Sequence, residues 1–329
     1  MPRIAIVNDI AGVARAEVDA LRESGWEVDF YEVRAPGARW PRWAKVLVAP
    51  VRLARSLPLI VRLRRGRHDL VHTHFVSQGF IAAFSGRPYV LHAHGSDLHQ
   101  NLKNPFYRAW TRMWLGGARG IFYVTPNLES YLSRYRAKAR LLPNPIAMER
   151  FAATPAPQAL RRVLIFMRLD PVKGSDAVFA VADELSRLVE VAAVDWGPLA
   201  GAYRQAYGAS VRFLERVPPE RIPELLAGFD AVIGQMELGV PGLSELEAMA
   251  AGRAVLMRLE PSLFPSDPPP VVNVAGGREL VAAIERLRNE PDELARLSAA
   301  GREWVRRNHS RDAHVEALKA AYREAAGVG

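Results

Sequence analysis

Residues 239–255 combine a loop rich in glycine and proline with the start of a helix that carries carboxylates. The segment reads Gly-Val-Pro-Gly-Leu-Ser-Glu-Leu-Glu-Ala-Met-Ala-Ala-Gly-Arg-Ala-Val. Amides at the opening of a helix lack partners within it, and the helix dipole adds positive charge there, so the segment predicts an anion site. Glu247 lies one turn further in, where a carboxylate can bind sugar hydroxyls. A ligand with phosphate and sugar, such as a nucleotide sugar, fits both features; an ordinary capped helix is the alternative interpretation.

Two cations follow an expected strand further upstream. Arg168 and Lys173 come after the apolar residues 163–166, and Lys173 directly precedes Gly174. An arginine fork matches phosphate oxygens, and a lysine adds a point charge beside them. We therefore expect both side chains to bind phosphate, although a loop with solvated charges fits the same residues. Gly197 marks a further glycine turn after residues 191–194.

The elements that would hold these side chains alternate between short apolar strands and helices. Expected strands are residues 4–7, 28–33, 70–74, 89–94 and 121–124, then 163–166, 191–194, 211–214, 231–233 and 254–256. The alternation predicts an α/β chain with two Rossmann-like domains, each with a parallel sheet, facing each other across a cleft. We place the domains at residues 1–150 and 151–310. The last helix, about 311–326, is able to pack back on the first domain.

Length and composition exclude several classes of protein. A chain of 329 residues exceeds one usual core, and 49% hydrophobic residues suffice for two. Cysteine is absent, which excludes disulfides and cysteine-ligated zinc. No apolar run approaches the roughly 20 residues that a membrane-spanning helix needs. Because the first strand begins at once, we expect no cleaved leader and a cytoplasmic protein.

In their order along the chain, these segments resemble the retaining glycosyltransferases of family 4, which have the GT-B fold. That family carries Gly-Arg-Leu-three residues-Lys-Gly, then Gly-x-Gly-Pro, then two glutamates eight positions apart that lead into Glu-Ala-Met-Ala-x-Gly. The matching residues of the C-terminal half are Arg168, Lys173, Gly174, Gly197, Pro198 and the run from Glu247 to Gly252. The N-terminal half matches at Gly12-Val-Ala-Arg15, Asp69-Leu-Val-His72-Thr-His74, His94-Gly-Ser-Asp97 and Leu142-Pro-Asn144-Pro.

The resemblance implies a role for each matching residue. Arg168 and Lys173 would neutralise the donor diphosphate as it leaves, which is electrostatic stabilisation of the transition state. His94 would contact the sugar, and Glu247 would hold the ribose hydroxyls. Since the cations do this work, we expect no metal and no cofactor besides a UDP- or GDP-sugar co-substrate. The implied donor-binding residues are Gly12, Gly197, Gly239, Val240, Pro241, Gly242, Leu243 and Glu247.

One departure from the family pattern concerns the paired glutamates. Gly239 stands where the first of the two is usual, eight residues before Glu247. Glu237 and Glu245 are the candidate substitutes, although neither holds the family's spacing. The resemblance therefore implies nucleotide-sugar binding more firmly than a particular sugar, and an inactive homologue is an alternative.

Histidines offer a competing interpretation. Six of the eight lie between residues 68 and 99. His72 and His74 sit two apart on one expected strand, as do His92 and His94 on the next, so each pair shares a face and the strands can form a histidine cluster. This suggests a metal-dependent hydrolase as an alternative. That alternative leaves the phosphate-binding cations unexplained, and we expect no metal site.

Basic residues concentrate in the N-terminal half. Residues 1–150 carry 23 Lys and Arg against 11 Asp and Glu, and ten basic residues lie between positions 33 and 68 without an acid. Such charge attracts nucleic acid or phospholipid, but tryptophan beside arginine favours an anionic membrane surface over nucleic acid. Pro58 is expected to kink or split the helix in this region. The expected membrane or acceptor residues are Trp40, Trp43, Arg52, Arg55, Trp110 and Trp114.

Together these features predict a cytoplasmic enzyme held peripherally on the inner face of the membrane. It would move a hexose, with retention, from a nucleotide sugar to a lipid-linked acceptor in cell-envelope or glycolipid synthesis. A soluble acceptor is the main alternative. The sequence leaves the base, the sugar and the oligomeric state open.

Overall fold

The computed structural model of the chain describes residues 2–10, 12–33, 49–95, 98, 102 and 105–327. The chain forms two compact units, Met1–Asn144 with Arg311–Gly329, and Pro145–Ser310. The first boundary lies at Asn144, six residues before the expected one. Helix α15 (Arg311–Ala326) belongs to the N-terminal unit.

The N-terminal unit is built on a six-stranded parallel sheet of order β2-β1-β3-β4-β5-β6. Its strands are β1 (Ile4–Val7), β2 (Val28–Tyr31), β3 (Leu70–His74), β4 (Tyr89–Ala93), β5 (Gly120–Tyr123) and β6 (Ala139–Leu141). The first five lie where the apolar runs predict them. Strand β6 was not expected, because it is a three-residue edge strand with an arginine at its centre and no apolar run.

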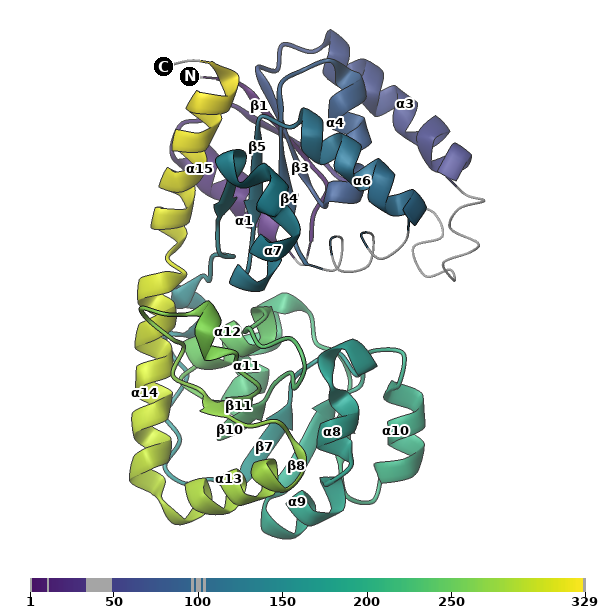
Figure 1. The fold of residues 1–329 in the computed structure, drawn as a ribbon. Coiled ribbons are helices and arrows are strands. Elements are labelled where there is room, and N and C mark those ends of the chain that lie inside the picture. The colour runs from purple at the N-terminus through teal and green to yellow at the C-terminus, as the bar shows by residue number, and fades with distance from the viewer. Residues whose placement is uncertain are drawn as a thin grey trace. The chain divides into compact units, whose positions relative to one another are not determined.

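Helices cover both faces of this sheet (Figure 1). One apolar core is formed by the sheet with helices α1 (Val13–Glu23) and α15. The other is formed by the sheet with helices α3 (Ala49–Arg65), α4 (Gly79–Ser85) and α6 (Pro105–Gly117). The short helix α7 (Glu129–Leu132) follows β5. Helix α3 continues through Pro58, so of the expected kink or split, the split is wrong. Proline has no amide hydrogen, so Pro58 cannot donate to the carbonyl of Ala54 as a regular helix requires. Because Pro58 and Ala54 are both exposed, water can donate to that carbonyl instead.

The C-terminal unit has a second six-stranded parallel sheet, of order β12-β11-β10-β7-β8-β9. Its strands are β7 (Arg162–Ile165), β8 (Glu190–Val194), β9 (Arg212–Leu214), β10 (Ala231–Ile233), β11 (Ala254–Met257) and β12 (Val272–Asn273). Its helices are α8 (Ser175–Phe179), α9 (Ala182–Leu188), α10 (Ala200–Tyr207), α11 (Ile222–Ala227), α12 (Leu243–Ala250), α13 (Gly277–Asn289) and α14 (Pro291–Asn308). The two-residue β12 was not expected. Within the described residues, no helix has the length and apolar character needed to cross a membrane.

Candidate functional site

Three loops of the C-terminal unit meet at one edge of its sheet. They follow β7, β8 and β10, which are neighbours in the sheet, so the loops leave its carboxyl edge side by side. Backbone hydrogen bonds join them: the Met236 amide donates to the Lys173 carbonyl at 2.8 Å, and the Leu169 amide donates to the Trp196 carbonyl at 2.9 Å. In open α/β sheets this edge is where ligands bind. The structure thus brings together the segments around Arg168, Gly197 and Gly239 that the sequence singles out.

Two glycines make this close packing possible. Gly197 has φ +120°, and a Cβ added there would lie 2.4 Å from the Leu169 carbonyl oxygen. Gly174 has φ +70°, and a Cβ there would lie 3.0 Å from the Met236 backbone. Both positions combine a left-handed backbone with direct backbone contact, which only glycine accommodates without strain. Gly197 therefore has a structural reason to be glycine besides the expected donor role.

The opening of α12 is fixed by a buried carboxylate. Glu245 is 1% exposed, and its two oxygens accept the amides of Gln235 at 2.9 Å and Gly242 at 2.8 Å. These bonds tie the end of β10 to the first turn of the helix. Because both oxygens already serve the backbone, Glu245 is a positioning residue, and the expectation that it reads the donor sugar needs correction. Glu237, in contrast, is exposed on the loop.

Sequence reasoning missed Gln235, which shapes the same loop. It is fully buried at the end of β10. Its side-chain oxygen accepts the amides of Glu237 and Leu238 at 2.9 and 2.6 Å, and its side-chain nitrogen donates to the carbonyls of Val240 and Arg258. The available signal was an amide side chain two residues after a buried strand and before a glycine- and proline-rich loop.

The two expected phosphate ligands are both present at this edge. Arg168 donates to Asp170 at 2.6 Å, and the other oxygen of Asp170 accepts the Val172 amide at 2.9 Å, so the carboxylate holds the guanidinium in place. Lys173 lies at the opening of α12, since a Cβ added at Gly242 would be 3.6 Å from its Nζ. Among the ion pairs of the described residues, none uses Lys173. Its charge therefore adds to the positive end of the helix dipole.

Glu247 occupies the middle of α12 and is partly buried. Burial raises the pKa of Glu247 to about 7, an effect that nearby Arg150 opposes and Glu245 reinforces. A carboxyl group with such a pKa changes its charge near neutral pH. It is therefore sensitive to a ligand that favours the ionised form.

In the N-terminal unit, histidines cluster around a buried glutamate, as the alternation along the strands predicts. His74 pairs with His92 across β3 and β4, and both face α1. We refer to Glu17, His72, His74 and His92, all with side chains fully inaccessible to solvent, as the Glu17 cluster. Burial would raise the pKa of Glu17, but the neighbouring histidines, His74 first, hold it well below its usual value.

His94 adjoins this cluster. Its Nε2 lies 3.0 Å from Nδ1 of His74, whose Nε2 lies 3.0 Å from Glu17. Burial, with the charge of His74 as the next cause, lowers the pKa of His94 to about 3. His94 is therefore a neutral imidazole at physiological pH, able to donate from one nitrogen and accept at the other.

The remaining expected residues of the N-terminal unit differ in their placement. Gly12 has φ +84° and caps α1, where Asp9 accepts its amide at 3.2 Å. Trp114 is 3% exposed and packs edge-on against Phe84, so it lies in the core and the expectation that it meets a membrane is wrong. Trp110 is partly buried beside it, Arg55 is exposed and Arg52 is partly exposed. Trp40 and Trp43 lie outside the described residues.

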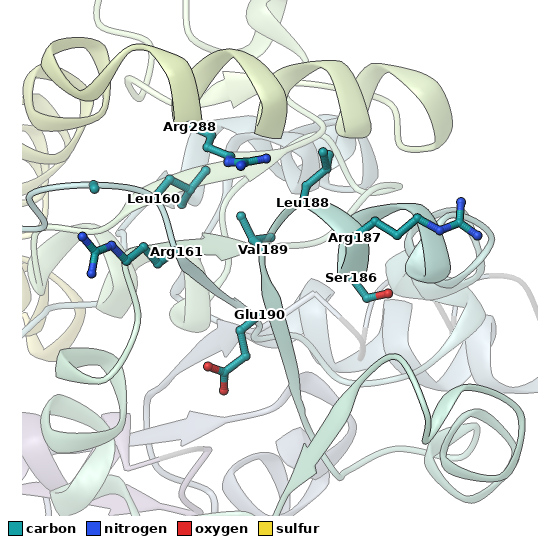
Figure 2. A pocket seen from close by; sticks show the side chains of 9 residues that line it. Leu160, Arg161, Ser186, Arg187, Leu188, Val189, Glu190 and Arg288 are labelled. Atoms are coloured by element: carbon teal, nitrogen blue, oxygen red, sulfur yellow. The ribbon is translucent and has the colours of Figure 1, made fainter.

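A separate open depression lies at the amino ends of β7 and β8. Figure 2 shows Arg161, Arg187 and Arg288 around it, with Glu190 below. Because β7 begins at Arg162 and β8 at Glu190, this is the sheet edge opposite the three loops. We assign the depression no part in the site.

Two family models of glycosyltransferases match the chain. Residues 11–150 match the family model described as Glycosyltransferase Family 4, and residues 179–320 match the one described as Glycosyl transferase-like. No curated protein sequence matches the chain.

Several solved structures have the same fold. Sucrose-phosphate synthase from Thermosynechococcus elongatus covers 100% of both chains with a TM-score of 0.78 at 18% identity. HepE from Anabaena, in complex with UDP and glucose, covers 97% of this chain and 99% of its own, with a TM-score of 0.72 at 12% identity. The catalytic domain of starch synthase IV from Arabidopsis thaliana, bound to ADP and acarbose, covers 99% of both chains, with a TM-score of 0.70 at 13% identity. At these identities the likeness concerns the fold.

Proposed function

We propose that this chain, which belongs to the glycosyltransferases of family 4 and has the GT-B fold, transfers a hexose from a nucleotide sugar to a lipid-linked acceptor at the inner face of the cytoplasmic membrane. The donor assignment rests on one observation. Three loops are hydrogen-bonded together so that Lys173 lies at the opening of α12, and Glu247 lies further along that helix. The complexes of similar enzymes with UDP and with ADP support a nucleoside diphosphate as the leaving group. UDP- and GDP-sugars are the donors we propose.

The diphosphate gains negative charge as its bond to the sugar breaks. Arg168, held by Asp170, and Lys173 would neutralise that charge, and the amides at the opening of α12 would add their partial positive charges. Groups fixed in place before the reaction need no rearrangement during it, which makes such stabilisation effective. Since side chains and backbone supply the positive charge, the proposed transfer step uses no metal ion or cofactor.

Glu247 and Glu237 would recognise the two sugars of the donor. In its ionised form, Glu247 can accept both hydroxyls of the ribose, and its pKa of about 7 makes that form available at neutral pH. Glu237 would bind hydroxyls of the transferred hexose, because it is exposed on the loop after β10 while Glu245 is committed to backbone amides. The remaining contacts would come from the backbone of residues 239–243.

We propose transfer with retention through attack from the face that the diphosphate leaves. The acceptor hydroxyl forms the new bond to the anomeric carbon, the bond from that carbon to the phosphate oxygen breaks, and the hydroxyl proton passes to the departing phosphate. In the N-terminal unit, neutral His94 would hydrogen-bond the hexose, and Gly12 would let the loop after β1 approach the diphosphate. Both assignments rest on the family resemblance.

A basic and apolar surface supports the membrane location. Of the eight exposed large apolar side chains among the described residues, four lie on α3, one on α4 and one on α6. We define the α3 face as these six with the exposed arginines of α3: Val51, Leu53, Leu57, Val61, Phe84, Met113, Arg55, Arg62, Arg64 and Arg65. Figure 1 shows α3, α4 and α6 on the same side of the N-terminal sheet.

The composition of the α3 face favours lipid over nucleic acid. Arginine near an anionic membrane contributes about 1 kcal/mol per residue and is screened by salt. Apolar side chains inserted below the headgroups add a contribution that salt does not screen. Nucleic acid offers no such apolar layer to exposed Leu57 and Val61, so these side chains distinguish the two partners.

The donor assignment can be tested by a thermal-shift screen of UDP-, GDP- and ADP-sugars on the intact chain, followed by donor-hydrolysis assays. A bound donor stabilises the folded state by about 2.7 kcal/mol at a hundredfold excess over its Kd. We expect stabilisation and slow hydrolysis with a UDP- or GDP-sugar. If no nucleotide sugar raises the melting temperature at millimolar concentration, the donor assignment is wrong.

The acceptor assignment can be tested with vesicles of anionic phospholipid. We expect the chain to float with the vesicles and to stay partly bound at high salt. Leu57→Ser with Val61→Ser should reduce the salt-resistant fraction, and Arg62→Gln with Arg65→Gln should reduce the salt-sensitive one. Leu141→Ser, which removes an exposed leucine of β6, is the matched control. Activity on soluble sugars without vesicle binding would instead indicate a soluble acceptor.

A further inference from the structure

The Glu17 cluster contains buried ring nitrogens without hydrogen-bond partners. Neither nitrogen of His92 has one, although its side chain is fully inaccessible to solvent, and Nε2 of His72 also lacks one. Buried polar groups in folded proteins are nearly always paired. The unpartnered Nδ1 of His92, which lies 3.7 Å from Oε1 of Glu17, therefore points to a partner that is not a side chain or backbone group.

The spacing of the cluster matches tetrahedral coordination. Nitrogens bound to zinc at 2.0–2.1 Å in a tetrahedron lie about 3.3–3.4 Å apart. Oε2 of Glu17 lies 3.0 Å from Nε2 of His74 and 3.9 Å from Nδ1 of His72, and its Oε1 lies 3.7 Å from Nδ1 of His92. These separations bracket the tetrahedral value, and all four ligand atoms lie within 4.8 Å of one another. Side-chain rotations that bring the farthest pair at most about 1.4 Å closer would therefore place all four on one ion.

The groups around the cluster are those that support metal ligands. His314 bridges Oε1 of Glu17 at 2.9 Å and the Pro143 carbonyl at 2.9 Å. His74 has a hydrogen-bond partner for its second nitrogen in His94. Metal-bound carboxylates and imidazoles characteristically have such outer partners, which fix their orientation. One group competes, because the Tyr322 hydroxyl lies 2.6 Å from Nδ1 of His72.

We propose that the Glu17 cluster is a structural binding site for a divalent cation of the zinc class. Imidazole with one carboxylate suits Zn²⁺, whereas Mg²⁺ and Ca²⁺ prefer oxygen ligands. All four side chains come from the protein and are inaccessible to solvent, which is typical of a closed structural site rather than a catalytic one. The ion would join α1 to β3 and β4. This revises the expectation of no metal site, and it does not depend on the proposed sugar transfer.

The test uses the full-length chain without an affinity tag, treated with a chelator and then titrated with Co²⁺ and Zn²⁺. We expect one ion per chain, the intense visible absorption of tetrahedral Co²⁺, displacement of Co²⁺ by Zn²⁺, and a higher melting temperature with Zn²⁺. His92→Gln should abolish the absorption and weaken binding by at least about 100-fold. His68→Gln is the matched control, because His68 is also buried beside a carboxylate, 2.8 Å from Asp29, outside the cluster.

Tyr322→Phe keeps the test decisive if the His92 variant does not fold. Removing the competing hydroxyl frees Nδ1 of His72, so Co²⁺ should bind several-fold more tightly than in the unaltered chain. A purely structural histidine network predicts no such gain. An octahedral Co²⁺ spectrum, full stoichiometry in folded His92→Gln, or unchanged affinity in Tyr322→Phe would each overturn the proposal.

Discussion

Replacing Glu245 by alanine would remove both acceptors that hold the start of α12 to the end of β10. The amides of Gln235 and Gly242 would then be left without their partner in a site that is 1% exposed. Each buried amide left unsatisfied costs about 1–3 kcal/mol. We therefore expect Glu245→Ala to lower the free energy of unfolding of the C-terminal unit by about 4 kcal/mol, the sum of two central values.

The glutamine variant gives an intermediate case. Glu245→Gln keeps the size of the side chain and one acceptor oxygen but presents an NH₂ group to the second amide. We expect a loss of about 2 kcal/mol. For a unit of this size, about 2–4 °C per kcal/mol predicts melting temperatures lower by roughly 4–8 °C for glutamine and 8–16 °C for alanine.

Differential scanning calorimetry can measure this effect for the relevant unit. The chain has two units, so the transition of the C-terminal one is identified as the transition that UDP raises. Glu237→Gln is the control, because Glu237 is exposed and its loss should leave the melting temperature unchanged. In activity assays, Glu245 variants should lower kcat/KM equally for all donors, whereas Glu237→Gln should change the preference between donor sugars. A Glu245→Gln enzyme of normal stability with altered sugar preference would refute this division of roles.

Four further outcomes follow from the site. Arg168→Ala and Lys173→Ala should each lower kcat/KM by roughly 10²-fold or more, as measured by release of the nucleoside diphosphate with folding checked by circular dichroism. Because the pKa of Glu247 is raised to about 7, UDP should bind about tenfold more weakly at pH 6 than at pH 8 in calorimetric titrations, and Glu247→Gln should lose this part of the pH dependence. The same raised pKa makes the free energy of unfolding fall as pH rises from 4.5 to 7, so Glu247→Gln should stabilise the ligand-free chain at pH 8 in urea titrations. Gly197→Ala, which forces a Cβ to within 2.4 Å of a carbonyl oxygen at φ +120°, should lower both the melting temperature and UDP affinity.

Sequence periodicity predicted ten of the twelve strands and both parallel sheets, because these strands are apolar runs buried on two faces. It failed at β6 and β12, where two or three residues at a sheet edge bury too little to leave a pattern. The sequence-based prediction also failed at Trp114, because the sequence shows that a tryptophan lies near arginines but not which way its ring points. Among the described side chains of α6, the exposed large apolar one is its neighbour Met113.

The carboxylates of α12 show why a motif alone underdetermines a site. Glu245 and Glu247 lie two residues apart on one short helix. The family pattern assigns a role to Glu247 but leaves the role of Glu245 open. A helix turns about 200° over two residues, so their side chains point in nearly opposite directions. One accepts the amides of Gln235 and Gly242, and the other lies in surroundings that raise its pKa. The three-dimensional course of the loop then shows what the pattern left open, namely that Glu245 is committed to backbone amides.

A metal ion in the Glu17 cluster would also determine which nitrogen of His94 carries its proton. With Nε2 of His74 donating to Glu17, a neutral His74 accepts at Nδ1, so His94 must donate from Nε2 and is left with an acceptor at Nδ1. If Nε2 of His74 binds a metal, its proton moves to Nδ1, which then donates to Nε2 of His94. The proton of His94 is then on Nδ1. The position of the His94 proton is thus coupled to a metal ion in the Glu17 cluster through the hydrogen bond between His74 and His94.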